Sequence, residues 1–193
     1  KILRMKFYHF NANKHLFSRD KNILIKHEVD SIKSYFKVLE KLRIKIKQSE
    51  RRALILQKAK NICTYLNKLG IKPGDKVGIC MQNCTEWVVI YVALAAYGAT
   101  VVPFNSWWKK EELSYGVEHS EVKLIFSDTK RYESLKNLNI EIIVNEPIDN
   151  KQTFNEIVSG TSTEWPEANA TEEDISVLLY TSGSTGLPKG VML

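Results

Sequence analysis

The chain has 193 residues, of which 44% are hydrophobic and 26% are charged, so it is long enough for a domain with a hydrophobic core and has the composition of a soluble globular protein. Its net charge of +6 is unevenly distributed along the chain. Residues 1–60 carry 17 Lys and Arg against 5 Asp and Glu, whereas residues 61–193 have a net charge of −6, and this distribution excludes a uniformly basic protein. The basic head is interpreted as a Lys-rich solvated helix, with binding to nucleic acid or acidic lipid as the alternative. No Arg-rich or stacked-aromatic motif favours nucleic acid.

The cysteines are Cys63, Cys80 and Cys84. Their number is odd, they show no Cys-x-x-C spacing, and no histidine is near them in sequence. This pattern favours small buried hydrophobic side chains in a reducing compartment over a redox or metal site. The sequence starts at Lys1 and has no apolar signal-peptide core near its start, so a cytoplasmic location is expected.

Two helices are expected in the first third of the chain. Residues 1–27 show no clear hydrophobic period, whereas residues 28–46 place apolar side chains near one face of a helix. A second helix is expected over residues 51–69, because Gly70 fits a helix C-cap and Pro73-Gly74 fits the turn that follows.

From residue 76 onward, short apolar runs alternate with helical patterns. Thr85 is expected to be the N-cap of the first of these helices, with Glu86 in its first turn. The alternation predicts an α/β fold, with a mostly parallel sheet and flanking helices. The expected strands are residues 76–81, 100–103, 122–127, 140–144, 175–180 and 191–193, and the expected helices are residues 85–97, 110–119, 131–138 and 154–158, with a helical turn at 171–174.

The segment from Trp87 to Trp108 contains no charged residue and is long enough to span a bilayer. Gly98 and Pro103 interrupt it, however, and Val101-Val102 favours a strand. A helix, a glycine turn and a strand therefore explain the segment better than a transmembrane helix does.

The segment TSGSTGLPKG, from Thr181 to Gly190, lies between two apolar runs. Gly183 and Gly186 let backbone N–H groups approach a ligand closely, and successive N–H groups in such a turn form an anion-binding nest. Four hydroxyl groups and the Lys189 ammonium add donors and a positive charge, so the segment suits a polyphosphate. The alternative, a flexible Ser/Gly hairpin with an incidental lysine, is disfavoured by the flanking strands and the Pro-Lys-Gly exit.

This loop differs from the two common phosphate-binding motifs. The P-loop of NTPases requires a lysine followed by Ser or Thr at the start of a helix. Here Gly190 follows Lys189, and Val191-Met192-Leu193 is typical of a strand. The spacing of the glycines also does not fit the dinucleotide-binding G-x-G-x-x-G motif.

The string LLYTSGSTGLPKGV resembles the phosphate-loop signature of the AMP-forming ligase superfamily, which includes acyl-CoA synthetases, luciferases and the adenylation domains of peptide synthetases. Every position of that signature is matched from Tyr180, where the family has Tyr or Phe, to Gly190. The upstream stretches LGIKPGDKVGICMQNCTEWVVIYVALAAYGATVVPFN and NSWWKKEELSYGVEHSEVKLIFSD are similar to the family in the same register. The Trp-Trp pair followed by Glu-Glu-Leu favours the fatty-acyl or medium-chain acyl-CoA synthetase branch.

The resemblance implies a reaction in two halves. A carboxylate attacks the α-phosphate of ATP in the presence of Mg²⁺, which gives acyl-adenylate and pyrophosphate, and the acyl group then passes to a thiol, usually that of CoA. The phosphate loop would hold the β- and γ-phosphates and stabilise charge as pyrophosphate leaves. No catalytic residue and no metal ligand is assigned within this chain. The residues expected to bind the nucleotide are Thr181, Ser182, Gly183, Ser184, Thr185, Gly186 and Lys189.

The resemblance extends over residues 57–193, which are expected to be a partial AMP-binding domain, whereas residues 1–56 are expected to be a basic, divergent helical segment. The chain would then be an incomplete N-terminal part of the large domain of an adenylate-forming enzyme. The expected substrate of that enzyme is a carboxylic acid, with a fatty acid favoured, and the chain by itself is expected to be inactive. The alternatives are a half-enzyme completed by a separate chain and a non-enzymatic module that acts through its basic surface.

A few other conspicuous residues are expected to have structural roles. His119, Glu86 and the turn at Asp128 are interpreted as caps or surface groups rather than catalytic residues. Trp107 and Trp108 are expected to cover an edge between a helix and the sheet.

Overall fold

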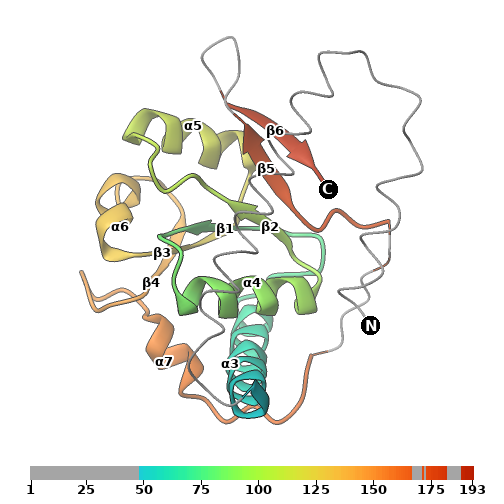
Figure 1. The fold of residues 1–193 in the computed structure, drawn as a ribbon. Helices are drawn as coiled ribbons and strands as arrows, with labels where there is room; N and C mark the ends of the chain where they lie inside the picture. The colour runs from blue at the N-terminus through green and yellow to red at the C-terminus, as the bar shows by residue number, and fades with distance from the viewer. Residues whose placement is uncertain (1–47, 167–170, 172, 182–187) are drawn as a thin grey trace. The chain divides into compact units, whose positions relative to one another are not determined.

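The computed structural model describes residues 48–166, 171, 173–181 and 188–193 (Figure 1). The chain divides into two compact units, residues 1–50 and residues 51–193. The elements below belong to the second unit, apart from the first three residues of the first helix. The expected helix over residues 28–46 lies outside the described residues, as does the basic head except for its residues 48–60, which belong to the first helix.

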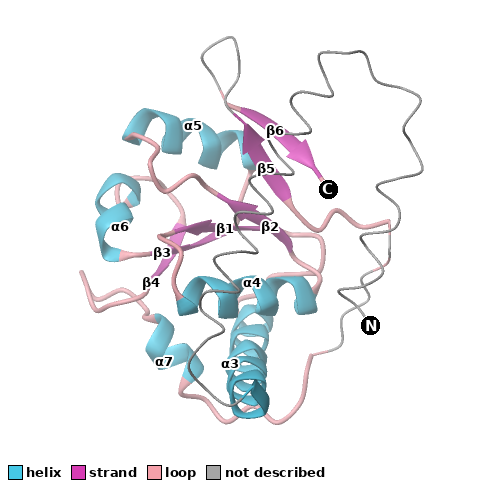
Figure 2. Ribbon diagram, viewed as in Figure 1, coloured by secondary structure: helices cyan, strands magenta, loops and turns pink. Residues whose placement is uncertain are grey.

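A parallel sheet of four strands forms the centre of this unit (Figure 2). The strands are β1 (Lys76–Cys80), β2 (Thr100–Pro103), β3 (Leu124–Ser127) and β4 (Glu141–Val144), and their order across the sheet is β2-β1-β3-β4. In the register, Val77 lies opposite Val101 of β2 and opposite Leu124 of β3. Most residues of these strands are buried, as is usual for parallel sheets covered on both faces. The predicted α/β fold is confirmed.

Five helices are described in this unit, and those around the sheet cover both of its faces (Figure 1). They are α3 (Gln48–Lys68), α4 (Thr85–Tyr97), α5 (Lys110–Ser120), α6 (Thr129–Leu135) and α7 (Phe154–Val158). Helix α4 lies on one face and carries α3, whose Cys63 thiol donates a hydrogen bond to the carbonyl of Ala93 (3.3 Å). Helices α5 and α6 lie on the other face, and α7 is tied to α3 because the Asn61 amide donates to the carbonyl of Val158 (2.8 Å).

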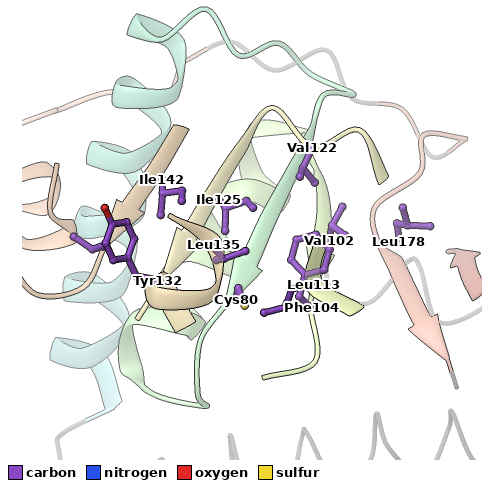
Figure 3. Packing of buried hydrophobic residues seen from close by; sticks show 11 residues of the cluster. Cys80, Val102, Phe104, Leu113, Val122, Ile125, Tyr132, Leu135, Ile142 and Leu178 are labelled. Atoms are coloured by element: carbon purple, nitrogen blue, oxygen red, sulfur yellow. The ribbon is translucent and has the colours of Figure 1, made fainter. Parts of the chain in front are cut away.

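The face of the sheet under α5 and α6 holds a cluster of buried hydrophobic side chains (Figure 3). Alternate residues of a strand point to the same face, so each strand contributes every second side chain to this cluster. Phe104 occupies the space above Gly78, where a Cβ atom would lie only 2.7 Å from the Phe104 ring. The members labelled in Figure 3 are Cys80, Val102, Phe104, Leu113, Val122, Ile125, Tyr132, Leu135, Ile142 and Leu178.

The prediction that Thr85 caps α4 is wrong. The N-cap is Cys84, whose backbone is extended and whose side chain makes no capping hydrogen bond, and Thr85 is the first residue of the helix. Glu86 lies in the first turn, as predicted, where its negative charge complements the helix dipole. A sequence pattern identifies a cap by residue type alone, and the backbone here turns one residue earlier than the favoured Thr.

Several boundaries also differ from the prediction by a few residues. Helix α6 begins at Thr129 instead of Arg131, because Asp128 caps it by accepting a hydrogen bond from the backbone N–H of Arg131 (2.8 Å). It ends at Leu135, and the following residues form a turn in which the backbone N–H of Leu138 donates to the carbonyl of Leu135 (2.9 Å). The strand expected over residues 122–127 begins only at Leu124, where pairing with β1 starts.

The uncharged segment of residues 87–108 folds as a helix, a turn and a strand, as predicted. Gly98 ends α4 with a φ of 85°, in the left-handed region that suits glycine, and its N–H bonds to the carbonyl of Leu94. β2 then begins at Thr100. Among the helices in the described part of the chain, none combines the length and the apolar character that a membrane crossing requires.

The three thiols are free, and two of them, Cys63 and Cys80, are buried as predicted. Cys84 is only partly buried, so the prediction fails for its exposure. Burial raises the pKa of Cys63 and Cys80 to about 12 and that of Cys84 to about 11. All three therefore stay protonated at neutral pH, and a protonated thiol is a poor nucleophile.

Candidate functional site

The glycine- and hydroxyl-rich segment connects the two strands of an antiparallel hairpin, β5 (Leu178–Thr181) and β6 (Lys189–Met192). In its register Tyr180 lies opposite Gly190, and Thr181 lies opposite Lys189. The predicted return of the chain after the loop is confirmed, although β6 begins at Lys189 and not at Val191. The predicted strand at residues 175–180 is displaced as well, to Leu178–Thr181.

The displacement of β5 has a structural cause, because the residues before it bond to the edge of the main sheet. Val101 donates from its backbone N–H to the carbonyl of Ser176 (3.0 Å), and the Thr100 hydroxyl donates to the carbonyl of Ile175 (2.8 Å). A single parallel bridge, Val101 to Val177, joins the main sheet to the hairpin. The chain then leaves β2 and pairs with β6 instead. The turn at Thr171 to Asp174 is present, with the backbone N–H of Asp174 donating to the Thr171 carbonyl (3.4 Å).

The hydrogen-bond pattern defines the two faces of the hairpin. Val177 and Leu193 exchange both of their backbone hydrogen bonds (3.2 and 2.9 Å), so they are a hydrogen-bonded pair. Such pairs recur every second residue, which makes Thr181 and Lys189 another hydrogen-bonded pair. Because side chains alternate between faces, Thr181 and Lys189 lie on one face and Tyr180 lies on the other.

The structure describes only the two ends of the predicted phosphate loop. Thr181 is partly exposed and its hydroxyl lies 3.5 Å from the carbonyl of Lys189, while Lys189 itself is exposed. Pro188, directly before Lys189, is buried. The remaining predicted nucleotide-binding residues lie outside the described residues, and they are Ser182, Gly183, Ser184, Thr185 and Gly186.

Tyr180 fastens the hairpin to the helix-covered face of the main sheet. Its ring packs on Trp108 edge to face, with 5.4 Å between ring centroids, and nearly parallel to Phe104 at 6.3 Å. Its hydroxyl lies 2.8 Å from Nδ1 of His119 and 3.4 Å from the carbonyl of Gly116, to which it donates. Burial raises the pKa of the Tyr180 hydroxyl, so the hydroxyl keeps its proton and can donate.

Gly116 allows this packing because its surroundings leave no room for a side chain. A Cβ atom there would lie 2.6 Å from the Trp108 ring and 3.2 Å from the Phe104 ring. Sequence reasoning did not indicate that Tyr180, Gly116 and His119 form parts of one site. A glycine within a helical pattern was the only local signal, since such a glycine often marks close packing.

The other residues interpreted as structural can now be placed. Asp128 is a helix cap, as predicted, and it also accepts from the backbone N–H of Gln82 (2.9 Å). His119 is exposed, as predicted, but bonds to the hairpin. Trp108 covers the helix–sheet edge, whereas the prediction for Trp107 is wrong because this residue is 81% exposed. The turn from Asn105 to Trp108 allows only one of the two adjacent rings to face the core.

The donors described at the loop ends suit an anionic ligand. A hydroxyl and an ammonium offer hydrogen bonds and positive charge to phosphate oxygens, whereas Mg²⁺ prefers carboxylate and other oxygen ligands. Within the part of the chain that the structure covers, no group of three or more His, Cys, Asp or Glu could hold a metal ion. The fold and the hairpin thus define an α/β protein with a candidate phosphate-binding hairpin at the edge of its parallel sheet.

A family model described as AMP-binding enzyme matches residues 54–193. The chain belongs to this family of adenylate-forming ligases. The match covers all of the described strands and ends with the hairpin.

Curated relatives of two kinds are similar to this chain. 4-Coumarate–CoA ligase 1 of Petroselinum crispum is 31% identical over 141 residues, which cover 70% of this chain and 26% of the ligase. One chain of the linear gramicidin synthase of Brevibacillus parabrevis is 29% identical over 137 residues, which cover 71% of this chain and 2% of that protein. The chain therefore spans about a quarter of the length of the CoA ligase that it matches.

Solved structures show the same fold. The anthranilate CoA ligase AuaEII, in complex with anthranoyl-AMP, matches with a TM-score of 0.67 and 25% identity, over 72% of this chain and 28% of that chain. ATP-bound MatB from Rhodopseudomonas palustris matches with a TM-score of 0.63 and 24% identity, over the same shares of the two chains.

Proposed function

We propose that the hairpin binds the β- and γ-phosphates of ATP as part of an enzyme that activates a carboxylate and transfers it to CoA. The observation that carries this proposal is the pairing of Thr181 with Lys189, which brings the two ends of the signature together on one face of the hairpin. The opposite face is fastened to the protein through Tyr180, so the Thr181 and Lys189 side chains are free to meet a ligand. The proposed binding residues are Thr181, Ser182, Gly183, Ser184, Thr185, Gly186 and Lys189.

The proposed role of these residues is electrostatic. ATP, with Mg²⁺ on its phosphates, supplies the α-phosphate that the carboxylate attacks and the pyrophosphate that leaves. The Lys189 ammonium and the hydroxyl groups would hold the β- and γ-phosphate oxygens and stabilise the charge that develops on the pyrophosphate. None of the seven residues carries a carboxylate, so Mg²⁺ would be held by phosphate oxygens and by groups other than these.

The acyl substrate and the extent of the enzyme are also proposals. A fatty or medium-chain acid is supported by the segment WWKKEEL, and an aromatic acid is the competing choice because two of the similar CoA ligases are named for aromatic acids. We assign residues 57–193 to a partial AMP-binding domain and residues 1–56 to a separate basic segment, in a cytoplasmic protein. The rest of the active site would be supplied by further sequence of the same protein or by a separate chain.

Replacing Lys189 with alanine tests the binding proposal. A charge-assisted hydrogen bond contributes about 1.5–3 kcal/mol, so we expect tripolyphosphate and ATP to bind the variant about tenfold to a hundredfold more weakly. Isothermal titration calorimetry on the 193-residue chain measures both affinities. Lys130→Ala is the matched control, because Lys130 is an exposed lysine on α6, away from the hairpin in the sequence and in the fold. Equal affinities for the wild type and the Lys189 variant would refute the proposal.

Isotope exchange between ATP and pyrophosphate tests the proposed reaction. The chain alone should give no exchange with any fatty or aromatic acid, because it spans about a quarter of the CoA ligases that it matches. A chimera in which residues 54–193 replace the matching segment of 4-coumarate–CoA ligase 1 should exchange, and lose exchange with Lys189→Ala. Exchange by the 193-residue chain alone would contradict the first expectation.

A further inference from the structure

We infer that His119 is a positioning residue for the hairpin. Its hydrogen bond to Tyr180 fixes the positions of Thr181 and Lys189 at the loop end of the two strands. The inference rests on the function proposed above, because phosphate binding by Thr181 and Lys189 requires the hairpin to hold these two residues in a defined position. It concerns residues of α5 and of the hairpin that are 61 positions apart in the sequence.

His119 contacts β5 and lies close to β6. Its Nδ1 lies 2.8 Å from the hydroxyl of Tyr180 on β5, and the two rings meet edge to face with 5.7 Å between centroids. On β6, a Cβ atom added to Gly190 would lie 3.8 Å from Cε1 of His119. The imidazole therefore lies beside the Tyr180–Gly190 pair, which is one residue pair farther from the loop than Thr181 and Lys189.

The imidazole is itself held in place. Tyr115, one turn earlier on α5, stacks on it with 5.3 Å between ring centroids and an angle of 28° between the planes. When Nδ1 carries the proton, it donates to the Tyr180 oxygen, and the Tyr180 hydroxyl is then free to donate to the Gly116 carbonyl. Both contacts from α5 can thus be satisfied at once, which makes the link between helix and hairpin directional.

The rest of the hairpin needs such a link near its loop. The bridge between Val101 and Val177 fastens its base to the main sheet. Toward the loop, Trp108 and Phe104 pack against the Tyr180 ring, but these apolar contacts are less directional than a hydrogen bond. A hydrogen bond of 2.8 Å fixes the tip of the ring, and through it the strand that leads to Thr181.

The faces of the hairpin separate this role from catalysis. Tyr180 lies on the face toward α5, whereas Thr181 and Lys189 lie on the opposite face. A ligand held by Lys189 would therefore lie across the hairpin from the imidazole. His119 acts through Tyr180, and we do not assign it to the reacting groups.

The test uses the 193-residue chain and the variants His119→Leu, His119→Asn, Tyr180→Phe and the double variant His119→Leu/Tyr180→Phe. Loss of one hydrogen bond changes an equilibrium by about fivefold. We expect His119→Leu to speed amide hydrogen exchange at Thr181 and Lys189 about fivefold and to weaken tripolyphosphate binding by a similar factor. Tyr180→Phe should have at least this effect, because it also removes the bond to the Gly116 carbonyl, and the double variant should add little to Tyr180→Phe alone.

His119→Asn is the rescue variant, because its side-chain amide places a hydrogen-bonding atom near the position of Nδ1. We expect it to restore slow exchange at Thr181 and Lys189 to within about twofold of the wild type. Glu118→Leu is the matched control, since Glu118 is exposed and adjacent on α5, and it should leave exchange in the hairpin unchanged.

Two results would overturn the inference. The first is unchanged exchange at Thr181 and Lys189 in both His119→Leu and Tyr180→Phe. The second is an equal acceleration at core amides such as Ile125, which would show that His119 supports the whole fold instead of the hairpin. Faster exchange confined to the hairpin supports the positioning role, even if the wild-type chain fails to bind tripolyphosphate; that failure would count against the proposed function alone.

Discussion

Asp128→Ala is expected to lower the free energy of unfolding by about 3–5 kcal/mol, because it leaves a buried positive charge without its partner. The side chain of Arg131 is 8% exposed and that of Asp128 is 14% exposed, and Nη1 of Arg131 lies 3.1 Å from Oδ2 of Asp128. The same carboxylate accepts from the backbone N–H groups of Arg131 (2.8 Å) and Gln82 (2.9 Å). Urea denaturation followed by circular dichroism measures the loss.

The consequence of this substitution reaches the hairpin. Nε of Arg131 donates to the carbonyl of Ser106 (3.0 Å), in the turn that leads to Trp108. A displaced Arg131 would loosen that turn, and Trp108 packs directly on Tyr180. We therefore expect the hairpin amides to exchange faster in Asp128→Ala.

Two further variants serve as controls for Asp128→Ala. Asp128→Asn keeps a capping oxygen but removes the charge, so its stability should lie between those of the wild type and the alanine variant. Glu133→Ala removes the partner of Lys136, the C-cap of the same helix, in an exposed ion pair and should change stability little. A loss below about 1 kcal/mol for Asp128→Ala would show that Arg131 finds another partner.

Gly116→Val is expected to destabilise the protein by about 2–3 kcal/mol through overpacking. A Cβ atom at Gly116 would lie 2.6 Å from the Trp108 ring, and a rigid ring packed against Phe104 and Tyr180 cannot yield easily. The branched side chain would push Trp108 away from Tyr180. Urea denaturation gives the stability change, and near-ultraviolet circular dichroism reports the altered aromatic packing.

Glu118→Val is the matched control for Gly116→Val. It places the same β-branched side chain in the same helix, but at an exposed position. Gly116→Ala should be milder than Gly116→Val, because alanine gains about 1 kcal/mol of helix propensity over glycine, which offsets part of the clash. Equal stability of Gly116→Val and Glu118→Val would refute the packing account.

Local sequence patterns predicted most of the elements because each pattern reflects a local cause. Apolar runs of four or five residues mark the strands, and Gly98 ends α4 where only a left-handed residue fits. The cap at Thr85 and the start of α6 were wrong for the same reason. Residue type indicates which side chains can cap a helix, while the path of the backbone decides which of them does.

The candidate site was predictable only in part. The order of residues from Thr181 to Lys189 indicated a phosphate loop, since few other chemistries use two glycines, four hydroxyl groups and a lysine together. The same order could not show that β5 would leave the main sheet after Val177, nor that Trp108 would turn inward while Trp107 stayed exposed. Those outcomes depend on packing against residues that are far away in the sequence.

By itself, the sequence determined the α/β pattern and the chemistry of the loop, because propensity, periodicity and donor type are properties of neighbouring residues. Only the tertiary structure decided the strand order β2-β1-β3-β4 and the meeting of His119, Gly116 and Trp108 at Tyr180. The contacts at Tyr180 join residues that are separated by more than sixty positions, so no local pattern could predict them. They form because packing α5 onto the sheet buries the aromatic rings against one another.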